Sequence, residues 1–276
     1  MKRTKNSHLT ILSQKSSKIP FLYPLIFFIF AILSSCQPTS IDLAGNWTFQ
    51  IDSNDVGETE GWYTRTLSDE ITLPGSMASN GLGNDITMET VWTGGMRNPN
   101  WSTDPSYAPY HDPENIRLPY WLQPEKKFTG AAWYQKEIEI PKSWLGKTLN
   151  ISLERAHWET TLWIDQQLVG SRNSLGTAHE YQVDNPLSTG KHRLTIRVDN
   201  STKKVDVGWD SHSISDHTQS NWNGLVGELK ISPLAEVQLR NIRINSNIDT
   251  KSILITCEIY NSRKEGRKAK VKAKVQ

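Results

Sequence analysis

Short runs in which apolar and polar residues alternate, separated by turn residues, constrain the fold of this chain more than any other feature. In Ala132–Ile140, Ile138 and Ile140 share one face of a strand, and Glu137 and Glu139 share the solvated face. Similar runs span residues 45–52, 149–154, 160–169, 194–199 and 226–231. No run of 12 or more residues has the apolar spacing of an amphipathic helix. The pattern therefore predicts an all-β protein, a β-sandwich or jelly roll.

Residues 74–130 interrupt this pattern with a long segment rich in proline and glycine. A loop of this length inside a compact domain is usually either functional or disordered, and its aromatic content argues against disorder. Its aromatic residues are Trp92, Trp101, Tyr107, Tyr110, Tyr120 and Trp121. Two interpretations remain open, because the loop either frames a ligand pocket or is merely pinned to the sheet by its aromatic side chains.

A second group of strands begins after Pro233, with alternating runs at 237–244 and 253–260. The basic residues Lys268–Lys274 alternate with small apolar residues, so we expect the solvated face of a half-buried strand rather than a membrane or nucleic-acid patch. About 40 residues are too few for an Ig-like sandwich of ~100 residues. We therefore expect the chain to end within an incomplete second domain.

The N-terminal 35 residues have the pattern of an export signal. Five basic residues and no acidic residue precede the short apolar run Leu25–Leu33, which is too short to span a ~30 Å bilayer core as a helix. The sequence Leu33-Ser-Ser-Cys36 resembles a bacterial lipobox, in which the cysteine is lipidated and becomes the mature N-terminus. We expect export and a lipid anchor on Cys36, on the periplasmic side of a bacterial membrane or at the cell surface.

Removal of residues 1–35 leaves 26 basic and 29 acidic side chains, a net charge of −3. This balance gives no indication of a nucleic-acid partner. Cys257 is then the remaining free thiol, and it shares a strand face with Ile253, Ile255 and Ile259. We expect Cys257 to be a buried, inert core residue.

Six segments in order resemble the N-terminal part of glycoside hydrolase family 2, which includes β-galactosidases and β-glucuronidases. They are Leu43–Phe49 with Asp52, Ile71–Gly75, Gly130–Pro141, Trp158–Gly170, Gly190–Asn200 and Trp222–Leu229. The resemblance covers residues 41–235. It implies a galactose-binding-like jelly-roll domain at 36–235, the truncated start of an Ig-like β-sandwich at 236–276, and a catalytic barrel after that. Residues 92–121 depart from the family as a longer insert.

In this family, one loop of the sugar-binding domain reaches the active site and supplies an acidic residue to the sugar. The matching segment here is Asp210–Gly224, and the resemblance nominates Asp216, His217, Asn221 and Trp222 as substrate-binding residues. A carboxylate accepts two hydrogen bonds from adjacent hydroxyls, and an indole packs against an apolar sugar face. The alternative is that Asp216 and Asn221 only organise a turn and that Trp222 belongs to the core.

Asp210, His212, Asp216 and His217 could also be read as metal ligands, but no further ligand spacing supports a metal site. The sequence has no phosphate-binding glycine loop and no serine–histidine–aspartate signature in context, so we expect no cofactor.

The resemblance implies a carbohydrate partner and a retaining glycosidase, which uses two carboxyl groups ~5–5.5 Å apart. Both would lie in the barrel beyond Gln276, so we expect no catalytic residue in this chain and no activity of the chain alone. The competing hypotheses are a stand-alone, non-catalytic carbohydrate-binding lipoprotein and a structural or adhesive surface lipoprotein. The sequence does not choose between galactoside, glucuronide and other sugars.

Overall fold

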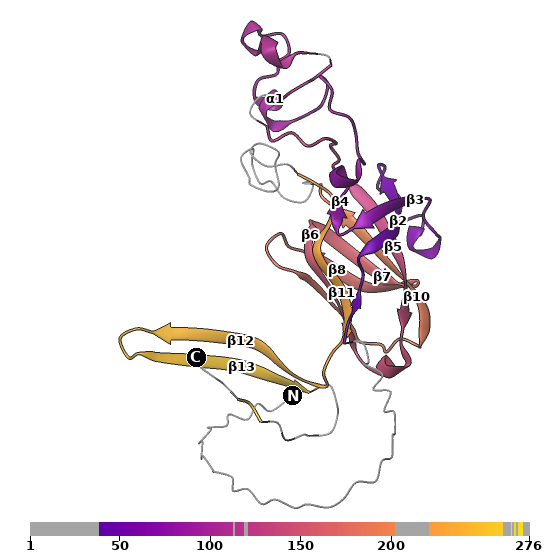
Figure 1. Ribbon diagram of the computed structural model, residues 1–276, viewed down its shortest axis with the longest axis vertical. Helices are drawn as coiled ribbons and strands as arrows, with labels where there is room; N and C mark the ends of the chain where they lie inside the picture. Colours follow the sequence, from indigo (N-terminus) through magenta and orange to yellow (C-terminus); the bar gives the residue numbers. More distant parts are fainter. Residues whose placement is uncertain are drawn as a thin grey trace, which may run out of the picture. The chain divides into compact units, whose positions relative to one another are not determined.

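The computed structural model describes residues 39–112, 114–118, 121–201, 221–261, 266, 268 and 270–272. Two antiparallel sheets form most of this part of the chain (Figure 1). One sheet has the order β1 (Ile41–Asp42), β11 (Gly224–Pro233), β6 (Leu149–His157) and β9 (His179–Val183), and β4 (Gly75–Ser76) pairs with β11. The other has the order β3 (Asp69–Leu73), β2 (Gly45–Asp52), β5 (Ala131–Ile140), β10 (Gly190–Asp199), β7 (Glu159–Ile164) and β8 (Gln167–Asn173). The predicted all-β sandwich is confirmed.

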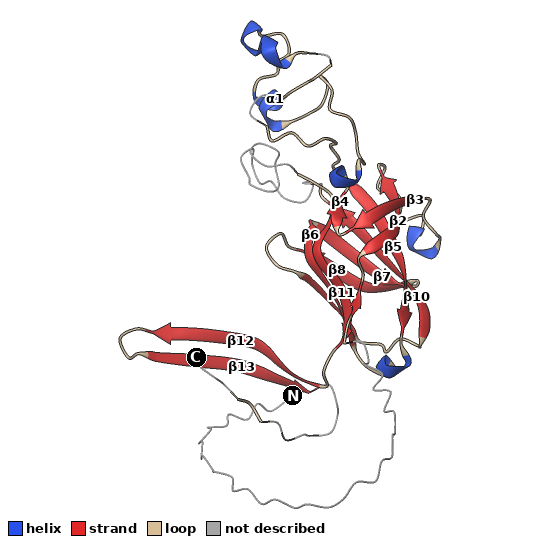
Figure 2. Cartoon of the chain, in the orientation of Figure 1, coloured by secondary structure: helices blue, strands red, loops and turns tan. Residues whose placement is uncertain are grey.

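Helices in the described part of the chain are short, of three to six residues each (Figure 2). They are α1 (Thr93–Arg97) and the 3-10 turns η1 (Trp62–Thr64), η2 (Ala78–Asn80), η3 (Pro105–Tyr110) and η4 (Lys142–Trp144). None of the described helices combines the length and apolar character needed to cross a membrane.

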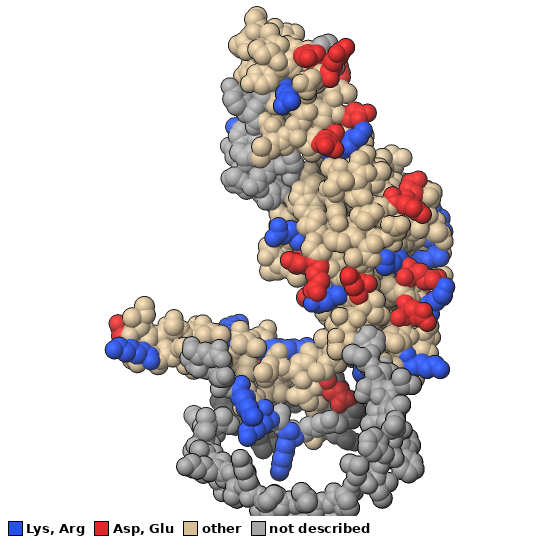
Figure 3. All heavy atoms as spheres, viewed as in Figure 1, with Lys and Arg blue, Asp and Glu red and all other residues tan. Residues whose placement is uncertain are grey.

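The main core lies between the two sheets and follows from the period-two pattern. Trp47, Tyr134 and Leu194 come from one sheet, Ile151 and Leu225 come from the other, and all five side chains are buried in one cluster. Some of the alternate residues of these strands, such as Asn46 and Glu154, are exposed, and acidic and basic side chains mix over the visible surface (Figure 3).

A second, smaller core covers the outer face of the six-stranded sheet. Trp62 and Leu67 pack there against Trp133 and Trp163, which lie on β5 and β7. The Trp133 and Trp163 rings are stacked with centroids 5.1 Å apart. These three tryptophans thus hold residues 55–67 against this face of the sheet.

The aromatic loop forms a third core of its own. Trp92, Trp101 and Trp121 are buried together with Leu118, and the Trp92 ring contacts Trp101 edge-on with centroids 5.8 Å apart. The two ends of the loop are closed by a pair of backbone hydrogen bonds between Asn84 and Lys127, of 2.8 and 2.9 Å. The described tryptophans pack on one another, so the interpretation that they pin the loop to the sheet is wrong. That the loop frames a ligand pocket stays a prediction.

The run at 160–169, which alternation alone predicts as one strand, is a hairpin, as the resemblance of Trp158–Gly170 to the family implies. The alternating run at 160–169 divides into β7 and β8 because the chain turns at Asp165, which adopts a left-handed backbone conformation with φ 55°. An Asp-Gln pair is a weaker turn signal than Asn-Gly or Asp-Gly. β9, which pairs with β6 and extends the five-stranded sheet, was not among the predicted strands.

The second group of strands is the hairpin of β12 (Val237–Asn247) and β13 (Ser252–Asn261). The prediction that Cys257 is buried is wrong, since it is exposed, as are Ile255 and Ile259 on the same face. The physical reason is that no second sheet covers this hairpin among the described residues. Residues 266, 268 and 270–272 belong to no strand, so the expected basic strand face is not observed there.

A buried polar chain links the two sheets around His179. The hydroxyl of Thr160 on β7 lies 2.6 Å from His179 Nδ1 and 2.5 Å from the Tyr181 hydroxyl on β9. His179 Nε2 is 2.9 Å from the carbonyl oxygen of Ser174, so it donates that bond and leaves Nδ1 to accept from Thr160. Burial lowers the pKa of His179, Arg172 acts in the same direction, and the bond to Ser174 opposes them. Burial also raises the pKa of Tyr181 to about 12.

This arrangement predicts a loss of stability in mild acid. Because the pKa of His179 is lower in the folded protein, the unfolded chain takes up the proton first as the pH falls below about 6.5. We expect the free energy of unfolding, measured by urea denaturation, to fall from pH 7.5 to pH 5, and to fall less steeply in His179→Gln. The other histidines contribute equally in the wild type and in His179→Gln. If the free energy of unfolding changed with pH equally in the two proteins, the assignment to His179 would be contradicted.

Candidate functional site at the ends of segment 202–220

The candidate site is the place where segment 202–220 leaves and rejoins the sandwich. Asp216 and His217 lie outside the described residues, as do Asp210 and His212. Asn221 and Trp222 are described, together with the residues that hold both ends of the segment. The structure therefore shows how the segment is anchored, and the ligand roles of the four nominated residues stay predictions.

Asn200 is the centre of this anchor. It directly follows β10, is fully buried, and uses its side-chain amide in several directions. Its Nδ2 donates to the carbonyl oxygen of Phe128 and to Asn221 Oδ1, both at 2.9 Å, and its Oδ1 accepts from the backbone N–H of Gly130 at 2.9 Å. One neutral side chain thus satisfies polar groups on two separate stretches of chain, 128–130 and 221.

Asn221 returns the contact. Its Nδ2 donates to the backbone carbonyl oxygen of Asn200 at 2.9 Å, so the two asparagines form a reciprocal pair. The pair closes segment 202–220 at its base, since Asn200 precedes the segment and Asn221 follows it. Both polar groups of the Asn221 side chain are used within the protein, which is the geometry of a loop anchor.

Asn223 completes what we call the asparagine knot, formed by Asn200, Asn221 and Asn223. Its Nδ2 donates to the carbonyl oxygens of Gly130 and Val198, each at 3.0 Å. Its Oδ1 accepts from the Tyr134 hydroxyl at 2.6 Å, and burial raises the pKa of Tyr134, which keeps that hydroxyl a donor. The knot therefore joins β5, β10 and the start of β11.

Gly224 lets β11 begin directly beside the knot. Its φ is +151°, and an added Cβ would lie 2.5 Å from the carbonyl oxygen of Gly75 and 2.7 Å from the Cα of Ser76 on β4. Real Cβ atoms do not approach backbone so closely, so only glycine fits here. This close approach holds β4 and β11 together at the same end of the sandwich.

Trp222 lies at the boundary between core and surface. Its side chain is half-buried, and its ring centroid is 4.6 Å from that of the buried His157, with the rings tilted by 33°. Trp158, which follows His157 in the sequence, donates its indole N–H to Asn173 Oδ1 at 2.7 Å. The peptide bond between His157 and Trp158 is cis. Trp222 is therefore not a fully buried core residue.

Sequence reasoning missed Asn200, Asn223 and His157. A signal was present for the asparagines, because Asp199-Asn-Ser201 and Asn221-Trp-Asn223 flank segment 202–220. Asparagine at both ends of a loop is consistent with side-chain capping of its backbone. No sequence pattern indicated a role for His157, because the ring that it contacts, Trp222, lies 65 positions later in the sequence.

Among the described residues, no group of three potential ligands could hold a metal ion.

Comparison with known proteins decides the family. Residues 100–232 match the model of "Glycosyl hydrolases family 2, sugar binding domain". The chain carries a glycoside hydrolase family 2 sugar-binding domain. The match includes the aromatic loop from residue 100 onward, the asparagine knot and segment 202–220. It confirms the resemblance found in the sequence.

The chain is also similar to proteins named β-glucuronidase. The chain is 20% identical over 240 residues to a β-glucuronidase of Paenibacillus borealis, covering 82% of this chain and 34% of that protein. It is 30% identical over 71 residues to a putative β-glucuronidase of Formosa agariphila, covering 26% of this chain and 7% of that protein. The chain thus spans about a third or less of the length of these curated relatives.

Solved structures share the fold. A β-glucuronidase of an uncultured Clostridium species has a TM-score of 0.52 at 18% identity, over 82% of this chain and 34% of that one. A β-glycosidase of Bacteroides vulgatus has a TM-score of 0.53 at 17% identity, over 82% of this chain and 25% of that one.

Loss of the knot should destabilise the sandwich. Asn200→Ala leaves buried groups of Phe128 and Gly130 without their partner, at a cost of about 1–3 kcal/mol for each unsatisfied group. We expect the free energy of unfolding to fall by about 2–4 kcal/mol. Asn221→Ala should cost about 1 kcal/mol and speed proteolysis between residues 202 and 220.

Asn54→Ala is the matched control, because Asn54 is exposed and such a surface substitution changes stability by less than about 0.5 kcal/mol. Urea denaturation and timed proteolysis with mass spectrometry measure both effects. If Asn200→Ala were no more destabilising than Asn54→Ala, the knot would not be the anchor.

Proposed function

We propose that this chain is the N-terminal sugar-binding portion of an exported family 2 glycosidase that acts on β-glucuronides. The match of residues 100–232 to the family 2 sugar-binding domain carries the proposal. The glucuronide assignment rests on the relatives that match 82% of this chain, which are named β-glucuronidases and favour this substrate over galactosides.

The proposed role of the domain is to hold segment 202–220 against a sugar bound in a catalytic domain that follows Gln276. The reciprocal bonds between Asn200 and Asn221, which hold together the residues that flank the segment, support this role. Asp216 would accept hydrogen bonds from two adjacent sugar hydroxyls, and Trp222 would pack against an apolar sugar face.

The chemistry itself would belong to two carboxyl groups of the catalytic domain. In a retaining glycosidase one carboxylate attacks the anomeric carbon while the other carboxylic acid protonates the leaving oxygen, and water then hydrolyses the glycosyl-enzyme. Residues of this chain would take no part in bond making or breaking. Their contribution would be orientation of the sugar.

Asp216→Asn in the full-length gene product tests this role. Loss of a charge-assisted hydrogen bond should lower kcat/KM for an aryl β-glucuronide by about 10- to 100-fold, with an unchanged unfolding temperature. Asp210→Asn, in the same segment, is the control and should retain most of the activity. If Asp210→Asn alone impaired activity, the assignment to Asp216 would be wrong, and a product that prefers aryl β-galactosides would contradict the glucuronide assignment.

Export and anchoring are the second part of the proposal. Leu33-Ser-Ser-Cys36 supports lipidation of Cys36 and attachment to a bacterial membrane on the periplasmic side or at the cell surface. Cells fed radiolabelled palmitate should label the wild-type protein in the membrane fraction. Cys36→Ser should abolish the label, whereas Cys257→Ser should retain it, and labelling of Cys36→Ser would contradict the anchor.

A further inference from the structure

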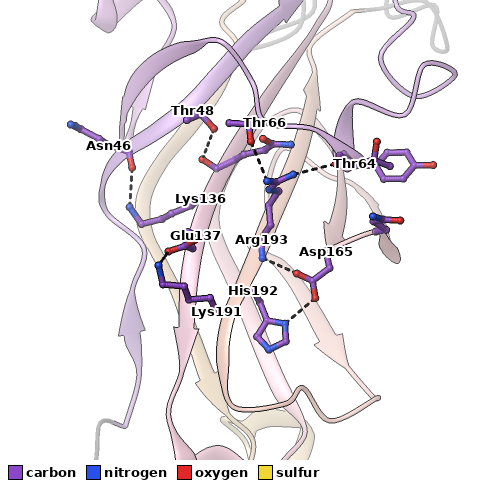
Figure 4. Close-up of a pocket in the computed structure, with 13 residues that line it drawn as sticks. Asn46, Thr48, Thr64, Thr66, Lys136, Glu137, Asp165, Lys191, His192 and Arg193 are labelled. Atoms are coloured by element: carbon purple, nitrogen blue, oxygen red, sulfur yellow. Dashed lines mark hydrogen bonds and ion pairs between the residues drawn. The ribbon is translucent and has the colours of Figure 1, made fainter.

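A polar pocket of about 700 Å³ lies on the outer face of the six-stranded sheet (Figure 4). The residues that line it include Asn46, Tyr63, Lys136, Gln166, Lys191 and Arg193. They come from β2, β5, β10, the turn between β7 and β8, and the 3-10 turn η1. Among the described residues that line it, none belongs to the asparagine knot.

One wall of the pocket is held rigidly. Gln135 on β5 is buried, and its Nε2 donates to the carbonyl oxygens of Trp62 and Arg65 at 3.1 and 2.9 Å. The Tyr63 ring stacks on Trp163 with centroids 5.3 Å apart and an interplanar angle of 2°. Because these contacts fix residues 62–66, the pocket is formed without a ligand.

Two cations of the pocket donate hydrogen bonds to neutral oxygens and form no ion pair with a carboxylate in the described part of the chain, and Lys136 also lies 5.6 Å from the centroid of the Trp47 ring. Arg193 donates to the carbonyl oxygen of Thr64 at 3.4 Å and to the Thr66 hydroxyl at 3.1 Å. Lys136 donates to the carbonyl oxygens of Ala44 and Asn46 at 3.2 and 3.1 Å. The Arg193 side chain lies in the middle of the lining residues in Figure 4, near Thr66.

The acids of the pocket are already engaged. Glu137 pairs with Lys191 at 2.7 Å. Asp165 accepts from the backbone N–H of Arg193 at 2.9 Å with one oxygen, and its other oxygen lies 2.9 Å from His192 Nδ1. The lining therefore has two carboxylates with partners and two cations without a carboxylate, an arrangement that favours an anionic ligand.

We propose that this pocket is a second, non-catalytic site that binds a sugar residue carrying a carboxylate, a uronic acid. The Arg193 guanidinium suits a planar carboxylate. The amides of Asn46 and Gln166 offer donors and acceptors to ring hydroxyls, and Tyr63 offers an aromatic surface. The volume exceeds what an inorganic anion needs and falls in the range of small-molecule sites. The proposal does not depend on the glycosidase assignment, since no residue of the asparagine knot is among the described residues that line the pocket.

Binding of D-glucuronate to the purified chain tests the proposal, with D-glucose as the neutral sugar and inorganic sulfate as the free anion. Amide chemical shifts in ¹H–¹⁵N spectra give both the Kd and the location. We expect glucuronate to bind at least tenfold more tightly than either comparison ligand, with shifts centred on residues 63–66, 166 and 191–193. Arg193→Gln should weaken glucuronate binding at least tenfold.

Gln166→Ala provides a second variant on an exposed turn and should weaken binding about threefold even if Arg193→Gln does not fold. Arg155→Gln is the matched control, because Arg155 is an exposed arginine on β6 of the other sheet. It should bind glucuronate as the wild type does. Equal affinity for glucose, equal affinity for sulfate, shifts confined to residues 200–223, or no binding would each overturn the proposal.

Discussion

The buried amide of Asn200 is the interaction on which the arrangement of the candidate site depends. It fixes the end of β10, the stretch that follows the aromatic loop, and the residue at which segment 202–220 ends. An asparagine suits this position because it is both donor and acceptor without carrying a charge that would have to be desolvated. Networks of this kind specify one arrangement only when every member is satisfied, as the bonds of Asn221 and Asn223 show.

Two long segments therefore share one base. The aromatic loop is closed by Asn84 and Lys127 and has its own core of tryptophans, so its internal order does not depend on the sheets. Phe128 and Gly130, which follow it, bond to Asn200. The residues that follow the aromatic loop and those that flank segment 202–220 are thus held at one anchor on the sandwich.

The sequence predicted the strands well, because residues on a half-buried strand must alternate between core and solvent. The run at 45–52 coincides with β2, and Glu137 and Glu139 lie on the exposed face as expected. Predictions failed where the outcome depended on distant partners. Cys257 lies on an alternating strand, but alternation indicates burial only when another layer covers that face. The pocket around Arg193 could not be predicted from the sequence either, since the residues that line it are spread between positions 46 and 193.

The central claim is that segment 202–220, held by the asparagine knot, contacts the sugar of a β-glucuronide. Photoaffinity labelling of the full-length gene product with an aryl β-glucuronide that carries a diazirine on the sugar tests this claim most directly. Mass spectrometry should locate the label in the peptide that contains residues 202–222, and excess unmodified glucuronide should prevent it. Saturable labelling of the downstream domain with none between residues 202 and 222 would contradict the account.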